Sequence, residues 1–387
     1  MNDGSRAENL SADIRRRRLR ILAGMATISF ARGAPSLDIV DVEGLAEAAQ
    51  SAFASDPAGT TAYGTSVGYV PLREYIASTH GVEADQVLVT NGSMQADAFL
   101  FQLLVGPGDA VVVESPTYDR TLLNLRNRGA DIHMVELETD GIDVDALEGR
   151  LREGLRPKLA HIIPNFQNPA GYTLCAPKRA KLLSLAAEYD FVLFEDDPYL
   201  SIRFEGEGLP TMLSNDEAGK VVYASSFSKT VCPGIRVGYL VGPAAVIKQI
   251  QGIATNTYIS PNMVAQSIVN QFCRSGRIDS VIATVKDALR ARRDALVSAL
   301  ERELPEARFA PPQGGYFMWV ELPEEVDVAE LETAAKERDV VFVKGTDFLL
   351  EGGTNTLRLA YSGVTPEQID EGITRLADAV RSLGVTA

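Results

Sequence analysis

The chain has 387 residues, of which 45% are hydrophobic and 23% are charged. This composition is that of a globular protein that can bury a core, and the length suggests two or three domains. The net charge of −15 argues against nucleic acid or an anionic membrane surface as a partner. The three cysteines lie far apart and the three histidines lack metal-ligand spacing, so we expect neither a disulfide framework nor a metal site.

The N-terminal part of the chain contains one basic block, Arg15 to Arg18 followed by Arg20. We interpret it as the solvated face of a helix rather than as a site for a polyanion. The sequence has no apolar leader near its N-terminus and no apolar run of about 18 residues. We therefore expect a cytoplasmic protein with no membrane partner.

From about residue 86, short apolar runs alternate with helical segments. The runs are almost wholly apolar, which is typical of strands covered on both faces, and the alternation predicts an α/β domain with a mostly parallel sheet. The predicted strands are 86–90, 109–115, 131–137, 159–165, 191–197, 220–226 and 236–242, and the predicted helices are 91–105, 118–129 and 178–190.

After about residue 275 the pattern changes to a long charged helix at 279–304, strands at 314–322 and 356–362, and a last helix. That helix has a clear start, because Thr365 and Gln368 form a capping box and Pro366 occupies the first helical position. Gly384 marks its end. This part predicts a smaller α+β domain.

Polar or Gly-rich segments follow several of the predicted strands. They read "TNGSMQ", "ESPTY", "PNFQNPAG", "EDDPY" and "SSFSK". In an open parallel sheet, ligands bind beyond the carboxyl ends of the strands, so these segments are where a site is expected.

In "TNGSMQ", Gly92 permits a tight turn into a helix whose first backbone N–H groups, at Ser93, Met94 and Gln95, could bind an anion. An ordinary helix N-terminus with no ligand is the alternative at this position.

In "EDDPY", the three acids Glu195, Asp196 and Asp197 follow a buried strand and call for a cation. Mg²⁺ in a nucleotide-hydrolysing protein is one choice, but the required G-x-x-x-x-G-K-[ST] loop is missing, as is a G-x-G-x-x-G turn for a dinucleotide. The other choice is the protonated ring nitrogen of a cofactor.

In "SSFSKTVCPGIR", a lysine at a strand end, Lys229, could form a Schiff base with an aldehyde in a dry cleft. If that aldehyde carried a phosphate, Ser226, Ser228 and Arg236 would supply donors for it. Each residue also has an ordinary interpretation, as a surface lysine, a serine-rich loop or a structural arginine, but these readings are improbable together.

These residues match a family. "SSFSKTVCPGIRVGYLVG" resembles the S-x-S-K-x-x-x-P-G-x-R-x-G signature of class I/II aminotransferases of fold type I, which use pyridoxal 5′-phosphate (PLP). "ISFARGAPS", "NGSMQA", "ESPTY", "PNFQNPAGYT", "EDDPY" and "LRLAYS" match the family's other motifs in order. The resemblance is greatest to 2-aminoadipate and kynurenine aminotransferases and to the effector domains of MocR-type regulators.

The resemblance implies a fold and a domain division. We expect a large PLP-binding domain at 45–274 with a mostly parallel seven-stranded sheet between helices, and a C-terminal small domain at 275–387. The segment 1–44 would join the small domain. A homodimer with shared active sites is also implied.

The resemblance also implies a role for each matched residue. Lys229 would hold PLP as a Schiff base and move a proton between substrate and cofactor, and Asp196 would keep the ring nitrogen protonated. Tyr199 and Asn168 would bind the 3′ oxygen and Tyr118 would stack on the ring. The phosphate would lie on Ser93, Met94, Ser226, Ser228 and Arg236, with Tyr63 from the neighbouring subunit. The substrate carboxylate would lie on Arg358, with help from Gly33 and Asn168.

The implied reaction moves an amino group from an L-amino acid to a 2-oxo acid, with 2-oxoglutarate as the expected acceptor. Another PLP enzyme of the same fold, a synthase, lyase or oxidase, is the alternative, because fold alone does not decide the reaction. A ligand-sensing regulator domain is a more remote one. The donor amino acid stays open, and one of Arg15 to Arg20 or Arg32 is a candidate to bind a distal carboxylate.

Overall fold

The computed structural model describes residues 26–384, so the basic block at Arg15 to Arg20 lies outside the described residues. Among the described helices, none is both long and apolar enough to cross a membrane.

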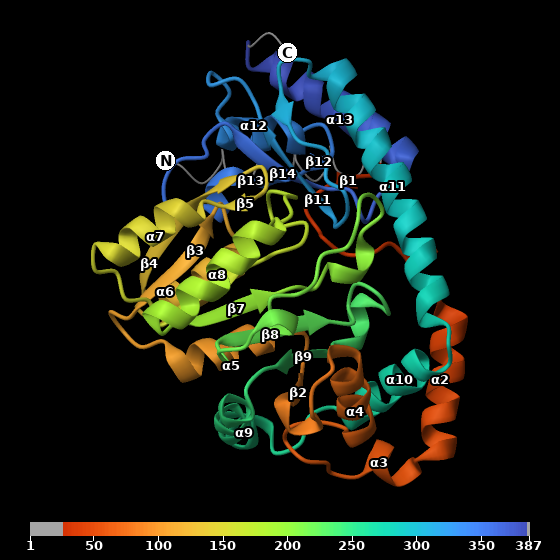
Figure 1. The fold of residues 1–387 in the computed structure, drawn as a ribbon. Coiled ribbons are helices and arrows are strands. Elements are labelled where there is room, and N and C mark those ends of the chain that lie inside the picture. Colours follow the sequence, from red (N-terminus) through yellow and green to blue (C-terminus); the bar gives the residue numbers. More distant parts are fainter. Residues whose placement is uncertain (1–25, 385–387) are drawn as a thin grey trace, which may run out of the picture.

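An eight-stranded sheet forms the centre of the larger part of the molecule (Figure 1). β9 and the two-residue β5 run in the direction opposite to that of the other six strands. All strands except β5 occupy the runs predicted from the sequence, so the predicted mostly parallel sheet is confirmed. It has eight strands rather than the expected seven, because the two-residue β5 pairs with the edge strand β4. In spatial order they are β2 (Val87–Thr90), β9 (Gly238–Val241), β8 (Val221–Ser226), β7 (Val192–Asp196), β6 (Leu159–Ile162), β3 (Ala110–Ser115), β4 (Asp131–Glu138) and β5 (Gly141–Ile142).

Helices cover both faces of this sheet, which explains why the central strands are apolar along their whole length. One buried cluster lies between the sheet and α5, α6 and α9, and a second lies between the sheet and α7 and α8. β4 departs from the prediction, because most of its side chains are only partly buried or exposed. It is the outermost long strand at its edge. The five helices are α5 (Ser93–Leu104), α6 (Asp119–Asn127), α7 (Val144–Arg152), α8 (Ala176–Tyr189) and α9 (Ala244–Tyr258).

The C-terminal part contains an antiparallel four-stranded sheet in the order β10-β11-β14-β13. The N-terminal β1 (Ile28–Ser29) pairs in parallel with β12 (Val340–Val341), so the start of the described chain lies beside its C-terminal part (Figure 1). Together with α12 (Val328–Lys336) and α13 (Pro366–Ser382) this is the smaller α+β unit that the sequence predicts. Its other strands are β10 (Arg308–Phe309), β11 (Phe317–Glu321), β13 (Val343–Lys344) and β14 (Thr356–Ala360).

The long helix α11 (Ile278–Glu303) runs along one side of the molecule from the region of α10 to α13 (Figure 1). The predicted capping box at the start of α13 is present, since the side chains of Thr365 and Gln368 each accept a backbone N–H of the other residue. The remaining α-helices among residues 26–384 are α2 (Val42–Ser55), α3 (Pro57–Thr61), α4 (Val70–His80) and α10 (Met263–Arg274).

Candidate active site

One pocket of about 150 Å³ lies at the carboxyl ends of the parallel strands. Segments that are far apart in the sequence meet there because parallel strands end at the same edge of the sheet. All but two of the lining residues, Ile163 and Pro198, are cofactor-site candidates from the sequence. The others are Ser93, Met94, Tyr118, Asn168, Asp196, Tyr199, Ser226, Ser228, Lys229 and Arg236.

Lys229 reaches this pocket from the loop after β8. Its Nζ donates a hydrogen bond to the carbonyl oxygen of Gly33 at 2.7 Å and lies 5.0 Å from the ring centroid of Tyr316. Burial, together with the charges of Arg358 and Arg236, lowers the pKa of Lys229 to about 8, against an opposing effect of Asp196. A neutral amine is therefore accessible near neutral pH, which a nucleophilic lysine requires.

Of the three acids at the end of β7, only Asp196 lines the pocket. Glu195 is fully buried and accepts hydrogen bonds from the backbone N–H groups of Met212 and Leu213 at 2.8 and 2.9 Å. Asp197, equally buried, accepts one from Asn165 Nδ2 at 2.7 Å. Burial raises the pKa of Glu195 to about 7 and that of Asp197 to about 8. The expectation of a metal ion or cofactor cation at all three acids is therefore wrong for these two, whose partners are hydrogen-bond donors and the Arg179 guanidinium of the protein itself.

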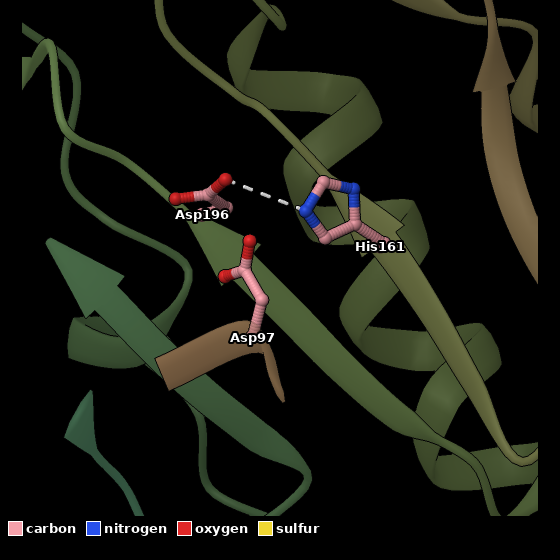
Figure 2. A group of neighbouring side chains, drawn as sticks. All are labelled: Asp97, His161 and Asp196. Atoms are coloured by element: carbon pink, nitrogen blue, oxygen red, sulfur yellow. Dashed lines mark ion pairs between the residues drawn. The ribbon is translucent and has the colours of Figure 1, made fainter. Parts of the chain in front are cut away.

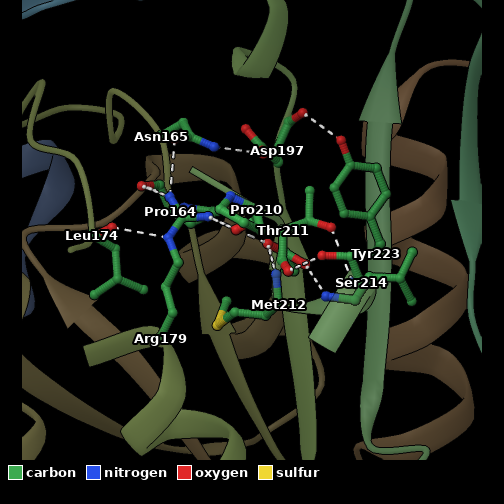
Figure 3. Close-up of polar contacts among 12 residues, drawn as sticks. Pro164, Asn165, Leu174, Arg179, Asp197, Pro210, Thr211, Met212, Ser214 and Tyr223 are labelled. Atoms are coloured by element: carbon green, nitrogen blue, oxygen red, sulfur yellow. Dashed lines mark hydrogen bonds and ion pairs between the residues drawn. The ribbon is translucent and has the colours of Figure 1, made fainter. Parts of the chain in front are cut away.

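A buried arginine holds the loops around these acids in place (Figure 3). Arg179 of α8 lies 3.9 Å from Glu195 and donates hydrogen bonds to Asn165 Oδ1 and to three backbone carbonyl oxygens, those of Leu174, Pro164 and Pro210. The loop after β6, which carries Asn168, is thereby tied to the end of β7, which carries Asp196.

Behind the pocket, Asp196 has two buried polar neighbours (Figure 2). His161 Nε2 of β6 lies 3.4 Å from Asp196 Oδ2. Asp97 of α5 is the third member of this group: one carboxylate oxygen of each acid and one ring nitrogen of His161 all lie within 4.8 Å of one another. Oδ1 of Asp196 has no hydrogen-bond partner. The sequence predicts an ordinary structural role for His161 and does not mark Asp97. The signal it lacked is the parallel register of β6 and β7, which brings His161 beside Phe194, close to Asp196.

Gly92, Ser228 and Arg236 form a cradle of hydrogen-bond donors at the N-terminus of α5. Gly92 has a φ of +74°, and a Cβ atom there would lie 2.1 Å from Arg236 Nη2. Arg236 Nη1 donates to Ser228 Oγ at 3.1 Å, and Ser226 Oγ donates to the same atom at 2.9 Å. The backbone N–H groups of Ser93 and Met94, two hydroxyls and a guanidinium suit an anion such as a phosphate. The prediction that Gln95 also offers its N–H is wrong, because that group donates to the carbonyl oxygen of Gly92 at 3.2 Å.

Arg358 of β14 is a second cation near the pocket. It is buried, donates to Asn168 Oδ1 and to the carbonyl oxygen of Ala31, both at 2.8 Å, and has its Nε unpartnered. Its guanidinium lies 4.2 Å from the ring centroid of Phe317 and 4.8 Å from that of Phe348. No described acid forms an ion pair with it, so this buried cation is suited to an anionic ligand.

Two further residues predicted for the site, Gly33 and Tyr63, do not line the pocket. Gly33 faces Lys229 through its carbonyl group, and a Cβ atom there would lie 2.2 Å from Phe317 Cζ. Tyr63 follows α3, is 90% exposed and does not line the pocket of its own chain. Arg236 is also exposed in the single chain, so the cradle is open on one side.

A mostly parallel sheet with a lysine, an acid that has one carboxylate oxygen without a partner and an anion cradle at its strand ends defines the class of fold type I PLP enzymes. Within that class the chain belongs to the aminotransferase class I and II family, whose model matches residues 26–376.

Named relatives are similar over nearly the full length. The chain is 34% identical to a 2-aminoadipate transaminase of Thermus thermophilus, over 98% of this chain and 96% of the relative. It is 32% identical to aromatic-amino-acid aminotransferase 1 of Thermococcus litoralis, over 97% of this chain and 93% of the relative. The crystal structure of the α-aminoadipate aminotransferase LysN of T. thermophilus, complexed with N-(5′-phosphopyridoxyl)-L-leucine, matches with a TM-score of 0.88 at 32% identity over 92% of each chain.

The protein is therefore a PLP-dependent aminotransferase. Its pocket fits the cofactor for two reasons. Asp196 Oδ1 is buried without a hydrogen-bond partner, and the lack of a side chain at Gly92 keeps the anion cradle open, because a Cβ atom there would meet Arg236.

Proposed function

We propose that Lys229 holds PLP as a Schiff base and that the enzyme moves the amino group of an L-amino acid to 2-oxoglutarate. One observation carries the assignment of the residues: the Lys229 amine, the unpartnered carboxylate oxygen of Asp196 and the donors around Gly92 line a single pocket. These three groups match the aldehyde, the ring nitrogen and the phosphate of one cofactor.

Bound PLP supplies an electron sink for the electrons released at the substrate α-carbon. Asp196 stabilises a proton on the ring nitrogen, and Tyr199 and Asn168 donate hydrogen bonds to the 3′ oxygen. Tyr118 stacks on the ring. Lys229 Nζ, once free, carries the proton that leaves the substrate α-carbon, a role supported by its lowered pKa of about 8.

Arg358 binds the α-carboxylate of the substrate. Its planar guanidinium can donate two parallel hydrogen bonds, and its position between two aromatic rings orients it. Asn168, which already accepts a hydrogen bond from Arg358, and Gly33 complete this side of the pocket.

A second copy of the chain completes each site by placing Tyr63 at the phosphate. The support is that Tyr63 is almost fully exposed in the single chain and that Arg236, on the phosphate cradle, is exposed as well. Ile259, a large apolar residue, is also exposed in the single chain, at 69%.

For the donor, the names of the relatives suggest 2-aminoadipate or an aromatic amino acid. A panel of amino acids added to the PLP-loaded enzyme, with loss of its visible absorption followed, ranks them directly.

A single-turnover experiment tests the reaction type. With one amino acid and no acceptor, the enzyme is expected to release one equivalent of the matching 2-oxo acid and to retain pyridoxamine phosphate. Release of ammonia or hydrogen peroxide with PLP unchanged would instead indicate a lyase or an oxidase.

A further inference from the structure

Asp97 is a buried acid for which the proposed function has no role. It lies in the second turn of α5, is 1% exposed, and its carboxyl group points toward Asp196 (Figure 2). Its Oδ1 has no hydrogen-bond partner. A buried carboxylate with a free oxygen is costly, so its placement beside a second carboxylate needs an explanation.

The surroundings of Asp97 oppose a negative charge on it. No lysine or arginine among residues 26–384 forms an ion pair with Asp97. The titratable groups around it are Asp196 of β7, His161 of β6 and, near both acids, Tyr118 at the start of α6, and Glu114 of β3 lies close to Asp196. Burial and the charge of Asp196 raise the pKa of Asp97 well above its usual value.

We propose that Asp97 is a positioning residue: a neutral carboxylic acid that donates its proton toward Asp196, directly or through one water molecule, and so sets how strongly Asp196 binds a protonated ring nitrogen. The inference rests on the proposed role of Asp196. One carboxylate oxygen of Asp97 and one of Asp196 lie within 4.8 Å of each other, a distance that a side-chain rotation or one bridging water molecule can span.

The physical effect is on the charge of Asp196. A hydrogen bond from a neutral acid draws part of the negative charge of a carboxylate toward the donor, so less of it is available on the opposite side. Asp97 therefore weakens the hold of Asp196 on the ring nitrogen and makes the cofactor a stronger electron sink than an isolated carboxylate would.

Two variants separate a neutral acid from an ionised one. Asp97→Asn keeps a donor of the same shape without a charge, and Asp97→Leu removes the donor. If Asp97 is neutral, the Asn variant should release PLP at the rate of the unsubstituted protein, whereas the Leu variant should release it about threefold to tenfold more slowly, as expected for the loss of one hydrogen bond. The pH dependence of the visible spectrum should likewise be the same in the Asn variant as in the unsubstituted protein and shifted in the Leu variant.

Infrared spectroscopy reports the proton directly. Near pH 7 the carbonyl stretch of protonated carboxyl groups in the unsubstituted apo-protein should contain one component that is lost in Asp97→Asn, whereas the components of Glu114, Glu195 and Asp197 are common to both proteins and cancel in the difference spectrum. This difference needs no cofactor and no active variant, and the difference between the unsubstituted protein and Asp97→Leu gives the same information if the Asn variant fails to fold. Thermal unfolding of both variants serves as the folding control.

Two outcomes would overturn the proposal: an Asn variant that changes PLP release as much as the Leu variant, or identical release and spectra in all three proteins. A failure of the proposed function is distinguishable, because it would appear in Asp196→Asn, which would then bind PLP and titrate like the unsubstituted protein.

Discussion

At the scale of single residues, Glu195 and Asp196 are neighbours in sequence with different environments. Glu195 points away from the pocket onto two backbone N–H groups, and Asp196 points into it. Asp196→Asn should keep part of the PLP affinity and lose about 10²-fold or more in kcat, because a neutral amide does not stabilise a proton on the ring nitrogen.

Steady-state kinetics and PLP titration measure this effect, and Glu195→Gln is the matched control. The control should lose some stability and keep its turnover per folded molecule. Near-normal kcat in Asp196→Asn would contradict the role given to Asp196.

Arg358 is the second residue whose role depends on geometry. Arg358→Lys keeps the charge and loses the planar pair of donors, so KM for the amino acid should rise roughly 10- to 100-fold, the value of one charge-assisted hydrogen bond. Initial rates over a range of amino-acid concentrations give KM, and Arg203→Lys, which removes another guanidinium that lies over an aromatic ring, is the control. An unchanged KM in Arg358→Lys would place the carboxylate elsewhere.

At the scale of elements, the start of α5 decides whether the cradle exists. Gly92→Ala adds a Cβ at a positive φ, 2.1 Å from Arg236, and should lower PLP affinity as well as stability. Gly81→Ala is the control, because Gly81 also has a positive φ, +66°, but faces open space.

We expect both alanine variants to lose about 1 kcal/mol of unfolding free energy from the backbone alone. Only Gly92→Ala should also raise the dissociation constant for PLP, measured by equilibrium dialysis. Equal PLP affinity in the two variants would argue against the cradle.

Elements also differ in how well the sequence predicts them. The central strands and α5, α6, α8, α11 and α13 are predicted within a few residues because apolar runs, a positive-φ glycine or a capping box mark them. α4 was not predicted, although Pro71 in its first turn and Gly81 after its end are start and stop signals of the kind that mark α13. No side-chain cap marks its start, and its buried face consists of Leu72, Ile76 and Ala77 alone. Its helical state depends on packing in a further buried cluster, in which Leu72 and Ile76 lie together with residues of the C-terminal part, and local sequence does not show this packing.

At the scale of the whole molecule, buried acids make stability depend on pH. Burial raises the pKa of Glu114 and Asp197 to about 8 and that of Glu195 to about 7. From about pH 4.5 to 8 the folded state therefore binds more protons than the unfolded state, so the unfolding free energy should fall as pH rises. Urea unfolding at about pH 5 and pH 8 measures it, Glu195→Gln should flatten the slope, and stability that rises over this interval would contradict the prediction.

The proposed dimer predicts that two defective subunits can restore one site. Lys229→Ala lacks the lysine and Tyr63→Ala weakens the phosphate site of its partner, but a mixed dimer has one site with both residues intact. Mixing and refolding the two variants should therefore restore PLP binding and activity above either variant alone.

Mixing Lys229→Ala with Asp196→Asn is the control, because neither mixed site is then complete. Activity of the first mixture that stays at the sum of its parts would exclude a shared site of this kind. The division at residues 44 and 274 stays a prediction.

The fold class, the family and all pocket-lining residues but Ile163 and Pro198 can be predicted from the amino-acid sequence, because strand ends of a parallel sheet meet at one edge and short motifs mark those ends. The direction in which each side chain points follows only from the folded chain. The tertiary structure turned Glu195 and Asp197 toward protein donors, left Asp196 facing the pocket, and placed His161 and Asp97 behind it. Such choices depend on strand register and on burial across distant segments, and neither is written in local sequence.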